Sequence, residues 1–468
     1  MRSLLFFLLC ALSAAASAAE RLEFTIHKLE SGVPGPTVLV VGGIQGDEPG
    51  GFHAASMLVT HYRATRGSVW IVPNLNFDSI VERSRGVYGD MNRKFDHVPA
   101  NDPDYDAVQR IKALITDEQV AFIFNMHDGS GFYRAEHTDW LHSPQRWGQS
   151  IVIDQEMLSV GQFANVGELS QTVVARLNAN LLDDEHVYHV KNTRTREGNA
   201  EMAKTLTYFA INHGKAAVGL EASKTLSTAQ RTFYHLSALE HFFEILGVSV
   251  EREFELDPQV VEAEIEDNIR IAFYRNKLLY DVANARSTIG YVPLQKGVDL
   301  EVEVSNPLIA LKKKGGGYRV NYGNRNVTYL QPQYFEYDDS LASILMEVDG
   351  VLRQVDLGSV IEVRDAFQVI HLEDAYRVNV IGWSRHNVDN ESNQEIRRGS
   401  IMRRFSVDEP GALFRVEVYR DQRFCGMVLV RFGDGDSTAP ARNASRISVD
   451  EHGPLAAFDG EVFEIGGR

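Results

Sequence analysis

The chain has almost no cysteine, with only Cys10 and Cys425 in 468 residues. Cys10 lies in an apolar N-terminal run that we expect to be removed, so the mature chain keeps one cysteine and forms no internal disulfide. Leu9 stands before Cys10 where a lipidation site would need a small residue, which disfavours a lipid anchor. An exported chain without disulfides is more typical of a bacterial periplasmic protein than of a small disulfide-stabilised scaffold.

The chain also lacks an excess of basic residues. Its 47 lysines and arginines stand against 64 aspartates and glutamates, which gives a formal net charge of −17. Removal of Arg2 with the N-terminal segment changes this to −17 − 1 = −18. Such a charge argues against nucleic acids and anionic membranes as partners. It does not exclude a small substrate, because a local basic pocket can lie within a negative field.

Long apolar runs are absent beyond the start of the chain. Arg2, the apolar residues 4–12 and the small residues Ala16-Ser17-Ala18 are typical of a secretory signal peptide, which we expect to comprise residues 1–18. The apolar run is too short to span a bilayer, so we expect no membrane insertion. The sequence therefore predicts a periplasmic protein.

Residues 20–250 alternate short apolar runs with amphipathic helical patterns, which predicts an α/β domain with a covered, mainly parallel sheet. The predicted strands are 37–41, 68–73, 120–126 and 216–220, and the predicted helices are 51–62, 105–114, 161–181, 199–213 and 228–246. Binding sites of such sheets lie beyond the carboxyl ends of the strands. Gln45, Glu48, His127 and Glu221 all fall just past predicted strand ends, so we expect them to lie together.

The pattern changes near Glu251, where short alternating strands separated by turn signals largely replace the helices. We expect one β-rich domain at 251–340 and a β-sandwich-like domain at 341–440. Glycine, serine, proline and asparagine cluster in the tail after Asp434, and residues 441–468 are expected to form a loosely ordered C-terminal extension.

Two potential metal ligands, Gln45 and Glu48, lie three positions apart on a glycine-rich turn after a buried strand. A third, His127, ends another apolar run. Three protein ligands that leave a coordination position for water are typical of a catalytic metal site. Each residue alone also has an ordinary interpretation, since Glu48 could cap the following helix and His127 could be a hydrogen-bonding residue at a strand end.

A second motif, Asp90-Met91-Asn92-Arg93, follows Arg85 closely. A guanidinium binds a carboxylate through two parallel hydrogen bonds, and a neighbouring asparagine amide adds a donor. Near a metal, this set suits a substrate with a free terminal carboxylate. Without that context the segment would be a solvated arginine-rich loop.

Taken together, these motifs resemble the M14 (carboxypeptidase A) family of zinc carboxypeptidases. The residues that carry the resemblance, in chain order, are Gln45, Glu48, Asp90, Asn92, Arg93, His127 and Glu221. The resemblance implies that Gln45, Glu48 and His127 hold one Zn²⁺ ion and that Asn92 and Arg93 grip the terminal carboxylate. It also implies that Glu221 is the general base, and we expect Arg85 to stabilise the oxyanion.

The chain resembles one branch of these enzymes still more, the cell-shape-determining D,L-carboxypeptidases of helical bacteria. That branch also carries glutamine at the first ligand position and has two β-rich domains after the catalytic one. The resemblance implies a carboxypeptidase-like mixed sheet flanked by helices, followed by two small β-rich domains of barrel or sandwich type. It implies removal of the terminal meso-diaminopimelate from peptidoglycan muramyl tripeptides, which leaves dipeptides and contributes to cell shape.

Gln45 is the main departure from the wider family, which has histidine at this position. An amide oxygen is a neutral and weaker zinc ligand than imidazole. We expect the Asp90 carboxylate to accept a hydrogen bond from the Gln45 amide nitrogen, which would turn the amide oxygen towards the metal.

Two other functions remain open from the sequence. Succinylglutamate desuccinylases and aspartoacylases share these motifs but remove acyl groups from amino acids, which fits an exported chain less well. A metal-free peptidoglycan-binding protein is the other alternative, with Gln45 marking loss of the metal. The β-rich domains could bind protein partners under any of these functions.

Overall fold

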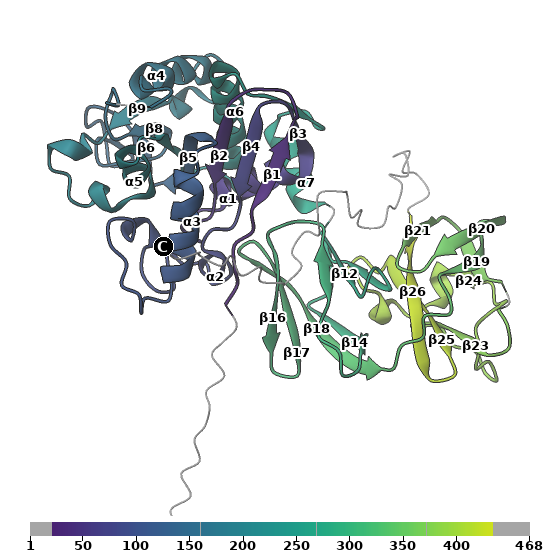
Figure 1. Ribbon diagram of the computed structural model, residues 1–468. Helices are drawn as coiled ribbons and strands as arrows, with labels where there is room; N and C mark the ends of the chain where they lie inside the picture. The colour runs from purple at the N-terminus through teal and green to yellow at the C-terminus, as the bar shows by residue number, and fades with distance from the viewer. Residues whose placement is uncertain (1–20, 160, 268, 371, 434–468) are drawn as a thin grey trace, which may run out of the picture.

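The computed structural model describes residues 21–159, 161–267, 269–370 and 372–433. The expected signal peptide and the C-terminal extension lie outside these residues. Within them, a helix-flanked N-terminal domain is followed by two β-rich domains, so the predicted fold class is confirmed (Figure 1). The domain boundaries proposed from the sequence stay predictions.

A mixed seven-stranded sheet forms the N-terminal domain. In spatial order its strands are β1 (His27–Glu30), β4 (Ser68–Val72), β2 (Thr37–Val41), β5 (Val120–Gly129), β10 (Ala216–Ser223), β8 (Ser150–Ile153) and β9 (His189–Asn192). The central strands β4, β2, β5 and β10 are parallel, whereas β1 and β8 pair antiparallel to their neighbours β4 and β10. Two small pairs accompany the sheet, β3 (Tyr62–Arg66) with β11 (Ser249–Arg252) and β6 (Phe132–Tyr133) with β7 (His142–Ser143).

Helices surround this sheet. They are α1 (Pro49–His61), α2 (Phe77–Val81), α3 (Tyr105–Thr116), α4 (Val166–Leu177), α5 (Leu206–Asn212), α6 (Thr228–Leu246) and α7 (Pro258–Glu266). Phe122 and Phe124 of β5 pack against Phe242 of α6, and this aromatic cluster is fully buried. Since side chains alternate along a strand, the opposite face of β5 carries Asn125 and His127. No helix in the described part of the chain combines the length and apolar character needed to cross a membrane.

The sequence predictions differ from the structure in several places in this domain; the helix predicted over 161–181, for example, is the shorter α4. The helix predicted over 199–213 is instead a short 3₁₀ turn, η4 (Met202–Lys204), followed by α5, and the Thr205 side chain accepts a hydrogen bond from the backbone of Tyr208 to start the second helix. The predicted change to β structure at Glu251 is interrupted by α7, which the Asp257 side chain caps and which packs against α6.

The middle domain contains two small sheets. The first has the order β13 (Leu278–Asp281), β12 (Arg270–Phe273) and β15 (Val302–Val304), and the second has the order β14 (Thr288–Gln295), β18 (Arg325–Phe335), β17 (Gly317–Tyr322) and β16 (Ile309–Lys314). Charged side chains of this domain contact the segment before Arg85. Lys312 lies 3.0 Å from Asp78, at the start of α2, and Arg319 lies 3.1 Å from Glu82, just after that helix.

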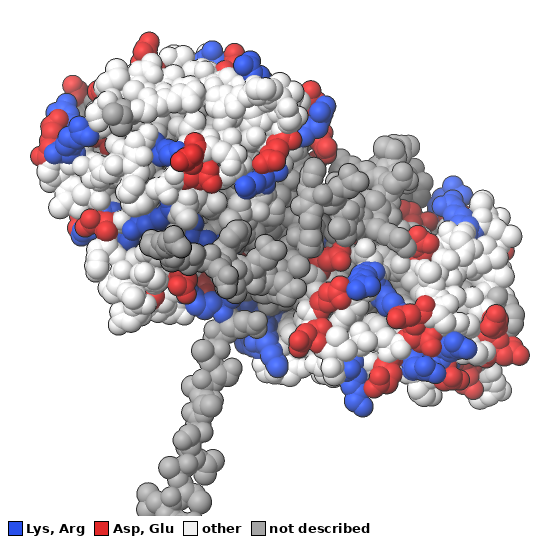
Figure 2. Space-filling view, in the orientation of Figure 1, with Lys and Arg blue, Asp and Glu red and all other residues white. Residues whose placement is uncertain are grey.

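The C-terminal domain is a sandwich of two four-stranded sheets around a separate hydrophobic core. One sheet has the order β20 (Val351–Asp356), β19 (Ser343–Val348), β22 (Ala366–Val369) and β24 (Ile396–Arg397), and the other has β21 (Val360–Val363), β26 (Arg423–Phe432), β25 (Leu413–Arg420) and β23 (Tyr376–Val380). Figure 2 shows charges of both signs interspersed on the face of the molecule that it presents. Cys425 is buried in this core and is a free thiol.

Candidate active site

The turn that carries Gln45 and Glu48 connects β2 to α1. Glu48 occupies the N-cap position of α1, but its side chain makes no capping hydrogen bond. Its carboxylate is buried and turns to His127 instead. The ordinary interpretation of Glu48 as a helix cap is therefore wrong.

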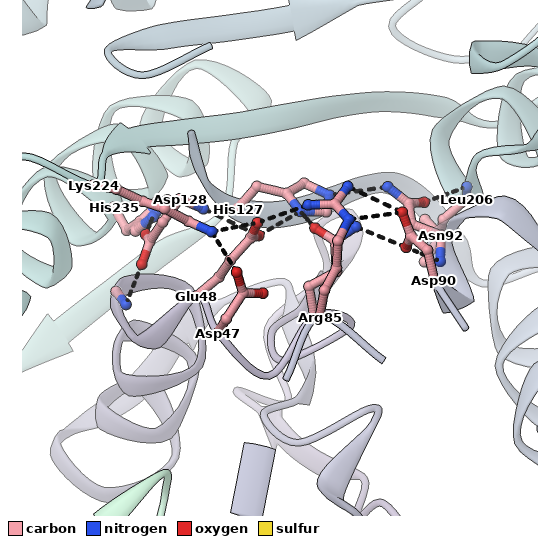
Figure 3. Close-up of polar contacts among 12 residues, drawn as sticks. Asp47, Glu48, Arg85, Asp90, Asn92, His127, Asp128, Leu206, Lys224 and His235 are labelled. Carbon is pink, nitrogen blue, oxygen red and sulfur yellow. Dashed lines mark hydrogen bonds and ion pairs between the residues drawn. The ribbon is translucent and has the colours of Figure 1, made fainter. Parts of the chain in front are cut away.

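Two side-chain oxygens, one from Gln45 and one from Glu48, approach the same ring nitrogen of His127. Figure 3 shows the Glu48 side chain directed towards His127. The Nδ1 atom of His127 lies 3.1 Å from Oε1 of Gln45 and 2.9 Å from Oε2 of Glu48. Ligand atoms of a tetrahedral zinc ion are about 3.3 Å apart, given metal–ligand bonds of about 2.0–2.1 Å. The spacing and chemistry of these atoms, one imidazole nitrogen and two oxygens, therefore fit a divalent cation.

Asp90 orients the amide of Gln45. The Nε2 atom of Gln45 donates to Oδ1 of Asp90 at 2.7 Å, which leaves the amide oxygen directed at His127. Arg85 donates to the other Asp90 oxygen at 3.0 Å. Burial works to raise the pKa of the Asp90 carboxyl, but the Gln45 hydrogen bond and the Arg85 charge outweigh it, and the pKa is lowered. Asp90 therefore stays ionised and holds the amide in one orientation.

The second ring nitrogen of His127 faces Asn92. The Nδ2 atom of Asn92 lies 3.3 Å from Nε2 of His127, and its Oδ1 atom accepts from the backbone of Leu206 at 3.0 Å. The Leu206 bond fixes which way the Asn92 amide points. If His127 binds a cation through Nδ1, its Nε2 carries a proton and cannot accept from Asn92. The Asn92 amide would then be available to a ligand.

Glu221 lies directly beside His127, since the two residues are paired in the parallel β5–β10 ladder. Burial raises the pKa of the Glu221 carboxyl to about 8; the nearby charges of Glu48 and Asp128 add to this, whereas His127 opposes it. A bound divalent cation would favour the ionised carboxylate. Both side chains face a pocket of about 250 Å³ whose lining also includes Gln45, Glu48, Arg85, Asn92 and Arg93.

The sequence placed His127 and Glu221 just past strand ends, and this placement is wrong. The strands are longer than the apolar runs: β5 continues to Gly129 and β10 to Ser223, so both residues lie inside paired strands. Their polar side chains end the apolar sequence pattern, but the backbone hydrogen bonds between β5 and β10 continue past them. A rigid sheet, and not a loop, therefore positions them.

Lys224 pairs with the two carboxylates of the turn after β2. Its ammonium lies 2.7 Å from Asp47 and 3.5 Å from Glu48. Arg85 approaches the same Glu48 carboxylate at 3.6 Å. Two cationic side chains thus surround the proposed ligand carboxylate.

Trp147 also lines the pocket. Arg194, Arg196 and Glu197 are not among the lining residues of this pocket. Met202, Thr205 and Thr207, which the sequence did not single out, line it instead. These three come from η4 and α5, where the predicted continuous helix is broken.

Sequence reasoning also missed the support behind the ligands. Asp128 points to the opposite face of β5 from His127 and is fully buried. It accepts hydrogen bonds from the backbone of Gly50 at 2.8 Å, from Arg231 at 2.7 Å and from His235 at 3.2 Å. Asp128 therefore ties β5 to the starts of α1 and α6. The position of Asp128 directly after His127 is the sequence feature that could have indicated this supporting role.

Gly46, between the two proposed ligands of the turn, allows a close approach to α2. A Cβ atom at this position would lie 2.0 Å from the backbone of Ser79, so the turn would have to move. We expect Gly46→Ala to reduce the free energy of unfolding by about 1–3 kcal/mol and to weaken metal binding, because it separates Gln45 from His127. Denaturant unfolding and metal titration measure both effects. Gly316→Ala, where a Cβ meets nothing within 4 Å, is the matched control and should change neither.

Comparisons with known proteins place this site in a wider context. Residues 1–266 match the model of a family described as carboxypeptidase controlling helical cell shape, catalytic, and residues 337–433 match the C-terminal domain of metallo-carboxypeptidase. These matches define the class of the protein as a metallo-carboxypeptidase. More specifically, the chain belongs to the family of carboxypeptidases that control helical cell shape.

Solved structures agree with this assignment. The chain is 36% identical to the cell shape determinant protein Csd4 from Helicobacter pylori in its apo form, with a TM-score of 0.78 over 88% of this chain and 100% of that one. The tripeptide-bound structure of Csd4 gives the same values. A structure described as the mDAP-bound form of Csd4, a D,L-carboxypeptidase, is 38% identical with a TM-score of 0.77, over 85% of this chain and 97% of that one. A comparison with curated protein sequences finds no match.

Proposed function

We propose that this protein is a zinc-dependent D,L-carboxypeptidase that removes the terminal meso-diaminopimelate from peptidoglycan tripeptide stems in the periplasm. The observation that carries the proposal is the meeting of Gln45, Glu48 and His127 in a pocket that Glu221 and Arg93 also line. Related Csd4 structures contain a tripeptide and mDAP, which supports this choice of substrate. The family is one of carboxypeptidases, which argues against the deacylase and the metal-free alternatives.

Gln45, Glu48 and His127 would hold one Zn²⁺ ion. Such an ion supplies Lewis acidity, which polarises a carbonyl group and makes water easier to deprotonate. Glu221 takes the proton from the attacking water and later delivers it to the leaving amine. Glu221 is half-buried and paired with His127 in the sheet, and it lines the substrate pocket, so its carboxylate is held beside the metal ligands.

The cationic side chains of the pocket would bind and orient the substrate. The Arg93 guanidinium and the Asn92 amide receive the terminal carboxylate, which places the last amide bond at the catalytic groups. Arg93 is held by its own contact to the Asn92 carbonyl at 3.0 Å. Arg85 is half exposed and supplies positive charge where the oxyanion develops.

Loss of the carboxylate contact should appear in substrate binding. We expect Arg93→Met to lower kcat/KM by about 10–100-fold, mainly through a higher KM, because a charge-assisted hydrogen bond contributes about 1.5–3 kcal/mol. Steady-state kinetics on a purified tripeptide measures the change. Arg196→Met is the matched control, since Arg196 lies outside the pocket lining, and should leave both constants unchanged.

Incubation with purified muropeptides tests the proposed activity directly. The zinc-loaded full chain should convert the tripeptide to the dipeptide and release one diaminopimelate, which mass spectrometry detects. The tetrapeptide, whose last residue is different, should remain intact. Release of an acyl group, or no product from any muropeptide by the metal-loaded chain, would contradict the proposal.

A further inference from the structure

A second pocket lies between the two β-rich domains, which the proposed catalysis does not use. Its volume is about 420 Å³, and its lining comes from β14 and β18 of the middle domain and from β23 and β25 of the C-terminal domain. The residues that matter for its chemistry are Tyr291, Phe335, Arg377, Arg415, Glu417 and Tyr419. Its size is typical of a small-ligand site.

A buried ion pair forms the floor of this pocket. Arg415 and Glu417 are 4% and 3% exposed, and Nη1 of Arg415 lies 3.3 Å from Oε1 of Glu417. Arg415 also donates to the backbone carbonyls of Tyr291 at 3.0 Å and Gly290 at 3.1 Å, which joins the two domains. These bonds hold a bulge of β14 in which Tyr291 has a φ of 55° and is 70% exposed at the pocket.

The ion pair is incompletely satisfied. Nε of Arg415 and Oε1 of Glu417 are buried and have no hydrogen-bond partner among the described residues. Oε1 of Glu417 still lies 3.3 Å from Nη1 of Arg415 in the ion pair, so Nε of Arg415 is the atom without a polar partner among the described residues. Both atoms are enclosed beneath the pocket floor, where the ion pair sets the charge at the base of the pocket.

Arg377 provides an accessible cation at the same pocket. Its guanidinium carbon lies 4.8 Å from the centre of the Tyr419 ring, and Nη1 donates to Asn379 at 3.0 Å. It forms no ion pair with any residue in the described part of the chain. A guanidinium stacked in this way is preorganised to bind a carboxylate in its plane.

We propose that this interdomain pocket binds the carboxylate end of a short peptide. Arg377 receives the carboxylate, the Arg415–Glu417 ion pair lies beneath the peptide at the base of the pocket, and the aromatic rings of Tyr291 and Phe335 cover the apolar part. A neutral sugar would leave the Arg377 charge unmatched. The proposal does not depend on catalysis at the N-terminal domain.

Hydrogen exchange by mass spectrometry tests this binding and locates it. The probe is the dipeptide L-alanyl-D-glutamate, compared with its diamide, and the protein is the full chain with Glu221→Gln to prevent turnover. We expect the dipeptide to protect residues 288–295 and 413–420, with protection lost for the diamide. Exchange at residues 120–129 reports separately on the catalytic site. Absence of protection at those residues would therefore count against the proposed catalytic function and not against binding at the second pocket.

Arg377→Gln is the informative variant, since Arg377 is only part-buried and its removal leaves the Arg415 contacts intact. In this variant, the dipeptide concentration that gives half-maximal protection of residues 288–295 should rise by at least about 10-fold. Arg420→Gln is the matched control, because Arg420 also lies over a tyrosine, Tyr376, but is not among the lining residues. The proposal is overturned if the dipeptide gives no protection at 288–295, if the diamide protects equally, or if both variants behave alike with unchanged thermal stability.

Discussion

Replacement of Glu221 by glutamine is expected to lower kcat by about 10²–10⁴-fold, the usual contribution of a general base. The amide keeps the shape of the side chain but can neither take a proton from water nor return one to the leaving amine. Glu221 is paired in the sheet beside His127 and makes no direct contact with the three donor atoms in the described structure. Bound metal should therefore remain at one ion per chain.

The measurement is steady-state turnover of the tripeptide together with metal analysis of the same protein preparation. Glu197→Gln serves as the matched control, because Glu197 is exposed and lies outside the pocket lining. It should retain wild-type kcat. A loss of less than 10-fold for Glu221→Gln, with metal retained, would remove Glu221 from the proton transfer.

Replacement of Gln45 by alanine should weaken zinc binding by more than about 100-fold. This exceeds the 10–100-fold that loss of an outer hydrogen-bond partner costs, because a direct ligand is removed. Gln45→His should keep or raise the zinc affinity, since imidazole is a stronger ligand than a neutral amide oxygen. Asp90 is placed to accept from an imidazole N–H as it does from the amide.

Competition with a chromophoric chelator gives the affinities of these variants. Asp90→Ala is an intermediate control, expected to weaken zinc binding by about 10–100-fold because the Gln45 amide loses its orientation. The predicted order of affinity is thus Gln45→His at least equal to wild type, then Asp90→Ala, then Gln45→Ala. Equal affinities across the series would show that Gln45 is not a ligand.

Much of the N-terminal domain is predictable from the sequence because its local signals are strong. The helix predicted over 228–246 matches α6, which begins after a capping box at Ser227 and ends at Gly247 with a φ of 81°. The strand predicted over 37–41 matches β2. The shared position of Gln45 and Glu48 at the pocket is predictable for the same reason, because the two residues lie three positions apart on one turn.

Contacts between distant parts of the chain are less predictable from the sequence. The buried set of Asp128, Arg231 and His235 joins β5 to α6, and no spacing rule connects residues about a hundred positions apart. Extension of β5 and β10 past their apolar runs depends on pairing with each other, which the residue pattern of either strand alone does not contain. The pocket-lining positions of Thr205 and Thr207 could not be predicted, because they depend on the break in the predicted helix.

The β-rich domains show the same limit. Alternation located strands such as β25 and β26, but the pocket between the domains arises where Arg415 crosses from one sheet to the backbone of another. In the sequence, Arg415 and Glu417 are two positions apart, which fits an ordinary strand pattern. Their contacts depend on the neighbouring domain, which the strand pattern does not identify.

X-ray absorption spectroscopy at the zinc edge of the zinc-loaded full chain tests the central claim most directly. One imidazole nitrogen and two protein oxygens on a single ion should give a first shell of nitrogen and oxygen neighbours at about 2.0–2.1 Å, with outer-shell scattering from one imidazole only. Gln45→His should add the scattering of a second imidazole. Two imidazoles in the unmodified chain, or an unchanged spectrum in the variant, would contradict the proposed ligand set.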